Sequence, residues 1–74
     1  MEQPRYDYSE LQGDIRRVFG TQNAFAKAMG MAESTLSLKL NNKAEWSQDD
    51  MMLAVRLLNA GTAKIGPYFF TRAV

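Results

Sequence analysis

Residues 21–43 read TQNAFAKAMGMAESTLSLKLNNK, and this stretch has the pattern of a helix-turn-helix. Two short helices that cross nearly at right angles need a small residue at the crossing and a glycine where the backbone reverses. Ala26, four residues after Gln22, supplies the first, and Gly30 supplies the second. The apolar residues that must fill the wedge between the helices fall in register at Phe25, Met29, Met31 and Leu36. The stretch therefore predicts a helix-turn-helix over residues 22–41.

The two helices of this motif have recognisable ends. Thr21 is suited to cap the first helix, and Gly30 ends it because glycine takes a positive φ at no steric cost. The second helix is expected from about Ala32 to Leu40, followed by the turn signal of residues 41–42. Its outer face carries short polar side chains, which allow a helix to lie deep in a DNA major groove. Those side chains are Glu33, Ser34 and Ser37, with Thr35 and Leu38 at the edges.

Another helix is expected before the motif. Ser9 and Gln12 have the spacing of a capping box, in which the serine bonds forward and the glutamine reaches back. Apolar residues then recur at helical spacing up to Gly20, which ends the helix. The expected buried stripe consists of Leu11, Ile15, Val18 and Phe19.

A fourth helix and a short last turn are expected after the motif. Ser47, followed by Asp49 and Asp50, opens the helix, because carboxylates in the first turn suit the helix dipole. Gly61 stops it, and Thr62 could cap the last turn. No stretch alternates with a period of two residues, so no strand is expected. We therefore predict an all-α bundle of four helices and a short fifth.

Composition limits what this fold could do. The 74 residues suffice for one domain, 1–74, and leave no room for a separate catalytic or ligand-binding domain. Cys and His are absent, so the usual metal ligands and general base are missing, and we expect no enzyme, metal or cofactor. No apolar run approaches the length of a membrane span and residues 1–5 do not read as a signal peptide, so we expect a cytoplasmic protein. We also expect no small-molecule substrate. The net charge is only +1, so any basic face must be local.

Residues 21–43 resemble the DNA-binding segment of phage repressor and Cro proteins, strongly over the two motif helices and in outline over the first and fourth. The segments 6–9 (YDYS) and 68–70 (YFF) are similar to those of a group of small phage regulators in that superfamily. The resemblance implies a five-helix repressor-like fold that binds double-stranded operator DNA as a homodimer. A sequence-specific transcriptional regulator of phage or prophage origin is therefore the expected function.

The resemblance also implies contacts residue by residue. In that family the first residue of the second helix anchors a phosphate, and the early positions of the recognition helix read base edges. The implied base contacts are Ala32, Glu33, Ser34, Ser37 and Leu38. The implied phosphate contacts are Gln22, Thr35, Lys39, Asn41 and Lys43. One departure is that the family usually has an apolar residue at the position of Lys39, whereas here it comes one later, at Leu40.

Several of these side chains have a second interpretation. Leu38 could touch a thymine methyl group or belong to the core. Glu33 could accept a hydrogen bond from a cytosine amino group or only favour the helix dipole. Arg16 and Arg17 suit a solvated helix face or a phosphate clamp, and Trp46 suits a lid on the core. The residues expected to fill the core are the methionines Met29, Met31, Met51 and Met52.

The last predictions concern assembly and a rival function. One recognition helix reads only a few base pairs, so operator binding needs two copies. Three consecutive aromatic residues cannot all face one core, so at least one should be exposed at an interface, unless Tyr68 reaches water while both phenylalanines close the core. The expected dimer interface is Leu57, Tyr68, Phe69 and Phe70. The rival is a protein-interaction module, for instance an antitoxin-type partner, built on the same scaffold.

Overall fold

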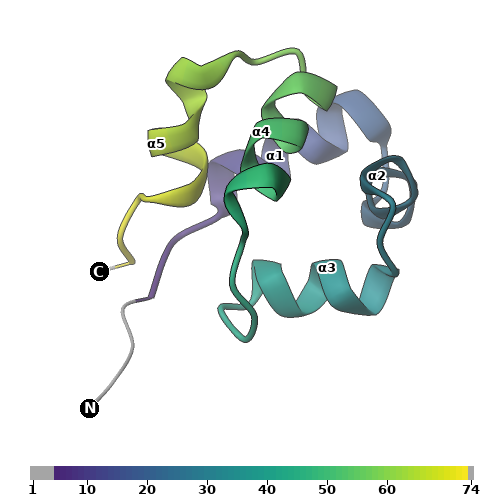
Figure 1. Cartoon of the computed structure of the whole chain (residues 1–74), viewed down its shortest axis with the longest axis horizontal. Coiled ribbons are helices and arrows are strands. Elements are labelled where there is room, and N and C mark those ends of the chain that lie inside the picture. Colours follow the sequence, from purple (N-terminus) through teal and green to yellow (C-terminus); the bar gives the residue numbers. More distant parts are fainter. Residues whose placement is uncertain (1–4, 74) are drawn as a thin grey trace.

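The computed structural model describes residues 5–73, which form five α-helices and one turn of 3-10 helix (Figure 1). The elements are α1 (Ser9–Phe19), α2 (Gln22–Met29), α3 (Glu33–Leu40), α4 (Gln48–Leu57), η1 (Thr62–Lys64) and α5 (Ile65–Phe69). The predicted all-α bundle with four helices and a short fifth is confirmed. Within these residues, no helix is both long enough and apolar enough to cross a membrane.

The helices α2 and α3 form the helix-turn-helix. In Figure 1, α2 is seen nearly end-on while α3 lies in the plane of the view, so the two helices cross steeply. Thr21 caps α2 as expected, since its hydroxyl accepts a hydrogen bond from the Ala24 N–H at 3.1 Å. Gly30 ends α2 at φ 74°, a conformation that glycine adopts without penalty. The turn that the sequence assigned to this glycine is therefore confirmed.

The start of α1 differs from the prediction. Ser9 is the first helical residue and not the cap, and Tyr8 before it makes no side-chain capping bond. The Asp7 carboxylate takes this role by accepting hydrogen bonds from both the N–H and the hydroxyl of Ser9. The expected capping box of Ser9 and Gln12 is wrong, because the serine hydroxyl turns back to Asp7 instead of forward.

The buried stripe of α1 is shorter than predicted. Leu11 and Ile15 are fully buried, but Val18 is 43% exposed. Phe19 is half-buried, and its ring packs edge-on against that of Phe25 with 5.3 Å between the centroids. The aromatic pair therefore closes the end of α1, and Val18 lies outside the core.

The fourth helix begins as predicted but ends earlier. Ser47 caps α4 and completes a capping box with Asp50, whose carboxylate accepts from the Ser47 N–H. The expected stop at Gly61 is wrong, because α4 already ends at Leu57. Asn59 adopts a left-handed conformation there, with φ 56°, which asparagine tolerates better than most residues.

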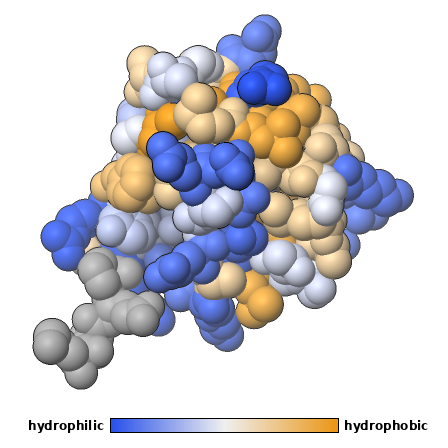
Figure 2. Space-filling model, in the orientation of Figure 1, coloured by the Kyte–Doolittle hydropathy of each residue, from blue (hydrophilic) through white to orange (hydrophobic). Residues whose placement is uncertain are grey.

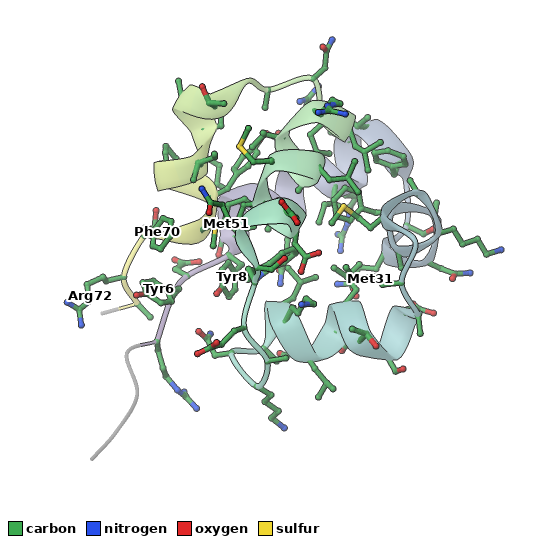
Figure 3. The ribbon with its side chains drawn as sticks, in the orientation of Figure 1. Tyr6, Tyr8, Met31, Met51, Phe70 and Arg72 are labelled. Carbon is green, nitrogen blue, oxygen red and sulfur yellow. The ribbon has the colours of Figure 1, made fainter. Side chains whose placement is uncertain are left out.

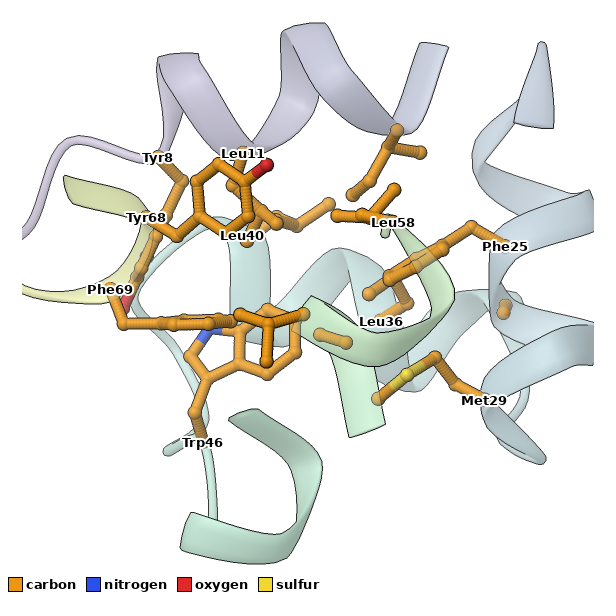
Figure 4. Packing of buried hydrophobic residues seen from close by; sticks show 14 residues of the cluster. Tyr8, Leu11, Phe25, Met29, Leu36, Leu40, Trp46, Leu58, Tyr68 and Phe69 are labelled. Carbon is orange, nitrogen blue, oxygen red and sulfur yellow. The ribbon is translucent and has the colours of Figure 1, made fainter. Parts of the chain in front are cut away.

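One hydrophobic core lies between the helices (Figure 4). Its largest fully buried side chains are Tyr68, Phe25, Phe69, Leu11, Ile15 and Leu36. Trp46 is buried as expected, and its ring lies 4.8 Å from that of Phe69 in an edge-to-face arrangement. The loop before α4 and the end of α5 are therefore joined through aromatic packing.

The methionines divide between the core and the surface. Met29 is buried, and Met31 and Met51 pack against the core while partly buried. Met52 is 40% exposed, so its predicted core position is wrong. Met51 and Met52 are adjacent in α4 and so face different directions, and of the two it is Met51 that packs against the core.

The two ends of the described chain are held together beside the loop that follows α3. Tyr6 pairs with Arg72 in an antiparallel bridge, and the Ala73 N–H donates to the Arg5 carbonyl at 3.1 Å. Asn42, at φ 62°, fastens the Tyr6 backbone with two hydrogen bonds. Its Oδ1 accepts from the Tyr6 N–H and its Nδ2 donates to the Tyr6 carbonyl, both at 2.9 Å. A residue just after α3 thus holds the N-terminal arm.

Candidate functional site on the helix-turn-helix

The side chains expected to read bases lie along one exposed side of α3. Ala32 is the residue just before the helix, Glu33 and Ser34 open it, and all three are exposed. Ser37 is half-buried one turn further on, and Leu38 is 47% exposed. The interpretation of Leu38 as a core residue is therefore wrong. The contact of these five residues with bases stays a prediction.

Lys39 is engaged within the protein. Its Nζ donates to the Asp50 carboxylate at 2.9 Å and to the Glu45 carbonyl at 2.8 Å, and it lies 5.8 Å from the centre of the Trp46 ring. Burial tends to raise the pKa of Asp50, but hydrogen bonds from Lys39 and Ser47 outweigh it and hold that pKa below its ordinary value. The Lys39 side chain is only 13% exposed, so it is not available as the phosphate contact that the resemblance implied.

The other phosphate candidates lie around the ends of the two motif helices. Gln22, the first residue of α2, is exposed and lines a shallow hollow together with Arg16 of α1. The side-chain amide of Asn41 turns back and donates to a carbonyl of the last turn of α3 at 2.7 Å, so it caps that helix. Thr35 and Lys43 are exposed. Their contacts with DNA stay predictions.

This surface carries few free positive charges. The charged residues of α3 are Glu33 and Lys39, and Lys39 is held by the protein's own oxygens. The exposed cations of the motif and its border that form no ion pair with a described residue are Arg16, Lys27 and Lys43; Arg17 is exposed too, but it pairs with Asp14. Neutralised phosphates supply most of the sequence-independent affinity of DNA-binding proteins. The helix-turn-helix therefore carries few free cations that could neutralise phosphates.

The aromatic ending differs from the predicted dimer interface. Tyr68 and Phe69 are fully buried, so their assignment to an interface is wrong. The alternative in which Tyr68 reaches water is also wrong, because its hydroxyl donates to Asp14 of α1. Burial, reinforced by this bond, raises the pKa of Tyr68, and the same bond lowers the pKa of Asp14. Of the four predicted interface residues, Phe70 is 51% exposed and Leu57 is half-buried.

A second surface was not anticipated from the sequence. An apolar hollow lies between α4 and α5, with Met52 and Phe70 among its lining residues. The surface seen in Figure 2 carries hydrophobic patches broken by hydrophilic side chains. Residue type alone assigned Met52 to the core, because the sequence does not show how α5 packs beside α4. The signals near this surface were the run of aromatics at 68–70 and Leu57, and they did not identify which ring is exposed.

The fold is that of a small helical protein with a helix-turn-helix. The chain belongs to the family described as "Protein of unknown function (DUF739)", whose model matches residues 5–72. The chain is also similar to a protein in a solved structure, the "Solution structure of the modulator of repression (MOR) of the temperate bacteriophage TP901-1 from Lactococcus lactis". The two sequences are 49% identical, the match covers 88% of each chain, and the TM-score is 0.78. No curated protein matches the chain. The resemblance to phage regulators is thus confirmed, and the narrower assignment to repressor and Cro proteins stays a prediction.

Proposed function

We propose that this protein modulates transcriptional repression in a temperate phage or prophage by binding a repressor protein. Its 49% identity to a phage modulator of repression supports the regulatory role. The protein would act as a single binding domain in the host cytoplasm and not as an enzyme. Among the two functions expected from the sequence, the protein-interaction module is therefore preferred to direct operator recognition.

The proposal rests on the small number of free cations on the helix-turn-helix. If Arg16, Lys27 and Lys43 each neutralise one phosphate, log K falls against log salt with a slope of about −2.7, since each contact contributes about −0.9. Proteins with about 6–10 phosphate contacts have slopes of about −5 to −9. A single copy would therefore bind DNA weakly at physiological salt and would need a partner protein to act at an operator, since only two copies together would reach a slope of about −5.

Operator binding as a homodimer is the second candidate function. It is favoured by the steep crossing of α2 and α3 and by the short exposed side chains at the start of α3. The phosphate contacts would then be Gln22, Thr35, Asn41 and Lys43, and the base contacts Ala32, Glu33, Ser34, Ser37 and Leu38. The two copies of α3 would enter successive major grooves about 34–36 Å apart, with Phe70 and Leu57 at the dimer contact.

One binding experiment separates the two candidates. The protein is titrated against the repressor of the same phage by calorimetry, and against a duplex of that phage's operator region by fluorescence anisotropy at several salt concentrations. We expect a saturable complex with the repressor, and weak DNA binding with a salt slope near −3. Tight binding to the operator without the repressor, with a slope of about −5 or steeper, would instead favour operator recognition.

A further inference from the structure

A groove runs along α4, and residues of η1 and α5 build its opposite wall. It consists of two adjoining hollows, of about 560 and 320 Å³, which share Met52. On the α4 side its lining residues recur at helical spacing from Gln48 through Met52 to Val55 and Arg56. The opposite wall includes Thr62, Ile65 and Phe70. On this face of α4, Gln48, Met52 and Arg56 are exposed at successive turns, while Val55 is buried.

The two ends of the groove differ in polarity. The end near the start of α4 is apolar, with Met51, Met52, Ile65 and Phe70 among its lining residues. Met52 and Phe70 are 40% and 51% exposed, so two large apolar side chains face solvent there. The other end contains Arg56, which forms no ion pair with any described residue. The carboxylates of α4 are Asp49 and Asp50, both in its first turn and so toward the apolar end, away from Arg56. Asp50 pairs with Lys39.

The contacts that join the N-terminal arm to the C-terminal segment, here called the clasp, also position Phe70 at the apolar end of the groove. The Tyr6 ring packs edge-on against Phe70, with the centroids 5.9 Å apart, and Figure 3 shows the two rings together on the side toward Met51. Asn42 holds the Tyr6 backbone at both its N–H and its carbonyl. Phe70 is thus supported in an exposed position by the ring of a residue whose backbone Asn42 holds.

A second copy of this chain does not suit the groove. The apolar residues lie at one end of the groove, and Arg56 lies at the other. In a two-fold symmetric dimer the same surface must pair with itself. If two such grooves met in opposite directions, the apolar end of each would face the arginine end of the other. The occupant must therefore have its own sequence of apolar and polar groups.

We propose that this groove binds an amphipathic helix of the partner protein, with large apolar side chains against Met52 and Phe70 and a carboxylate against Arg56. The helix α4, from Gln48 to Leu57, is about 14 Å long, or nearly three helical turns, which suits a partner helix that presents apolar side chains every third or fourth residue. The inference rests on the proposed function for the identity of the partner, which is the repressor, and it names the surface that holds it.

The test measures the affinity of the repressor of the same phage for the full-length protein and three variants. Met52→Ala and Phe70→Ala should each weaken binding about tenfold or more, because large side chains at the centre of an interface dominate its affinity. Val18→Ala is the matched control, since Val18 is exposed to a similar degree on α1 and lies outside the groove. Its affinity should change less than twofold. Circular dichroism melts establish that each variant is folded.

A second titration uses a synthetic amphipathic helical peptide of about 15 residues, with Phe and Leu four apart at one end and Glu at the other. We expect saturable chemical-shift changes at Met52, Ile65 and Phe70. A peptide with Lys in place of Glu should bind more weakly to the wild type, and Arg56→Glu should reverse this preference.

The outcomes distinguish the inference from the proposed function. If the repressor binds and Met52→Ala and Phe70→Ala bind it as tightly as Val18→Ala does, the groove is not the docking surface, while the proposed function stands. If the repressor does not bind the wild type, the proposed function fails, and the peptide titration then decides the inference. Saturable shifts along the groove that follow the Arg56 charge reversal would support it, and their absence would overturn it.

Discussion

Replacing Lys39 by Met tests whether this lysine belongs to the protein's own structure and not to a DNA-binding surface. Methionine keeps most of the length of the side chain and removes only the ammonium group. The substitution breaks two hydrogen bonds, to the Asp50 carboxylate at 2.9 Å and the Glu45 carbonyl at 2.8 Å. An exposed ion pair contributes at most about 1 kcal/mol, and a hydrogen bond to a charged group about 1.5–3 kcal/mol.

The Lys39 pair is neither fully exposed nor fully buried, since its two side chains are 13% and 25% exposed. We therefore expect Lys39→Met to lower the free energy of unfolding by about 1–2 kcal/mol. For a domain of this size that corresponds to a fall in Tm of about 4–16 °C. Salt should reduce the loss only partly, because this pair is screened less than an exposed one.

The stability difference should also depend on pH. The pKa of Asp50 is held below its ordinary value of 3.8, so its contribution is fully present above that value and is lost as the pH falls through the lower folded-state pKa. The wild type and Lys39→Met should therefore differ most near neutral pH and converge in acid below about pH 4.

Thermal melts at pH 7 and at pH 3 measure both effects, and Lys43→Met is the matched control. Lys43 is exposed, so its replacement should change the free energy of unfolding by less than about 0.5 kcal/mol. The structural role of Lys39 is refuted if Lys39→Met is no less stable than Lys43→Met at pH 7. It is also refuted if Lys39→Met lowers the salt slope of DNA binding by about one, which would place the ammonium group at a phosphate.

Three further substitutions test other parts of the fold. Tyr68→Phe should cost about 1–2 kcal/mol in urea denaturation, because Asp14 loses its hydroxyl donor; an unchanged midpoint would show that water replaces it. Asn42→Ala should cost about 2–3 kcal/mol, because it removes both bonds to Tyr6 and places alanine at φ 62°. Hydrogen exchange should then speed up at the Tyr6 amide, and unaltered protection there would show that Asn42 does not hold the Tyr6 backbone. Asn59→Gly should raise stability by up to about 1 kcal/mol in thermal melts, since glycine takes φ 56° freely; a loss would mean that the asparagine side chain is needed.

The helix-turn-helix could be predicted from sequence because its determinants are local. Thr21 and Gly30 mark the ends of α2 through capping and backbone conformation, which act within a few residues of the chain. Phe25 and Leu36 are fully buried at the positions that helical spacing assigned to the core. The same logic failed at Ser9 and Gly61, where Asp7 and Asn59 were equally able to perform the local role.

The parts of the candidate site that could not be predicted depend on contacts between distant segments. The departure at position 39 was visible in the sequence, but Asp50, the partner of Lys39, lies in another helix. The run of three aromatics indicated one exposed ring without identifying it, because the direction of Phe70 depends on how α5 docks against α1 and α4. Periodicity reports which face of a helix is apolar and not whether a neighbouring element covers it.

Whether this protein acts through a repressor is tested most directly by titrating the operator with its repressor in the presence and absence of the protein. Saturating protein should shift the repressor concentration needed for half-occupancy by about fivefold or more, the usual scale of coupling between two binding events. The protein without repressor should leave the operator unprotected in the same footprinting measurement. A footprint from the protein alone, together with an unchanged repressor titration, would show instead that it acts on the operator directly.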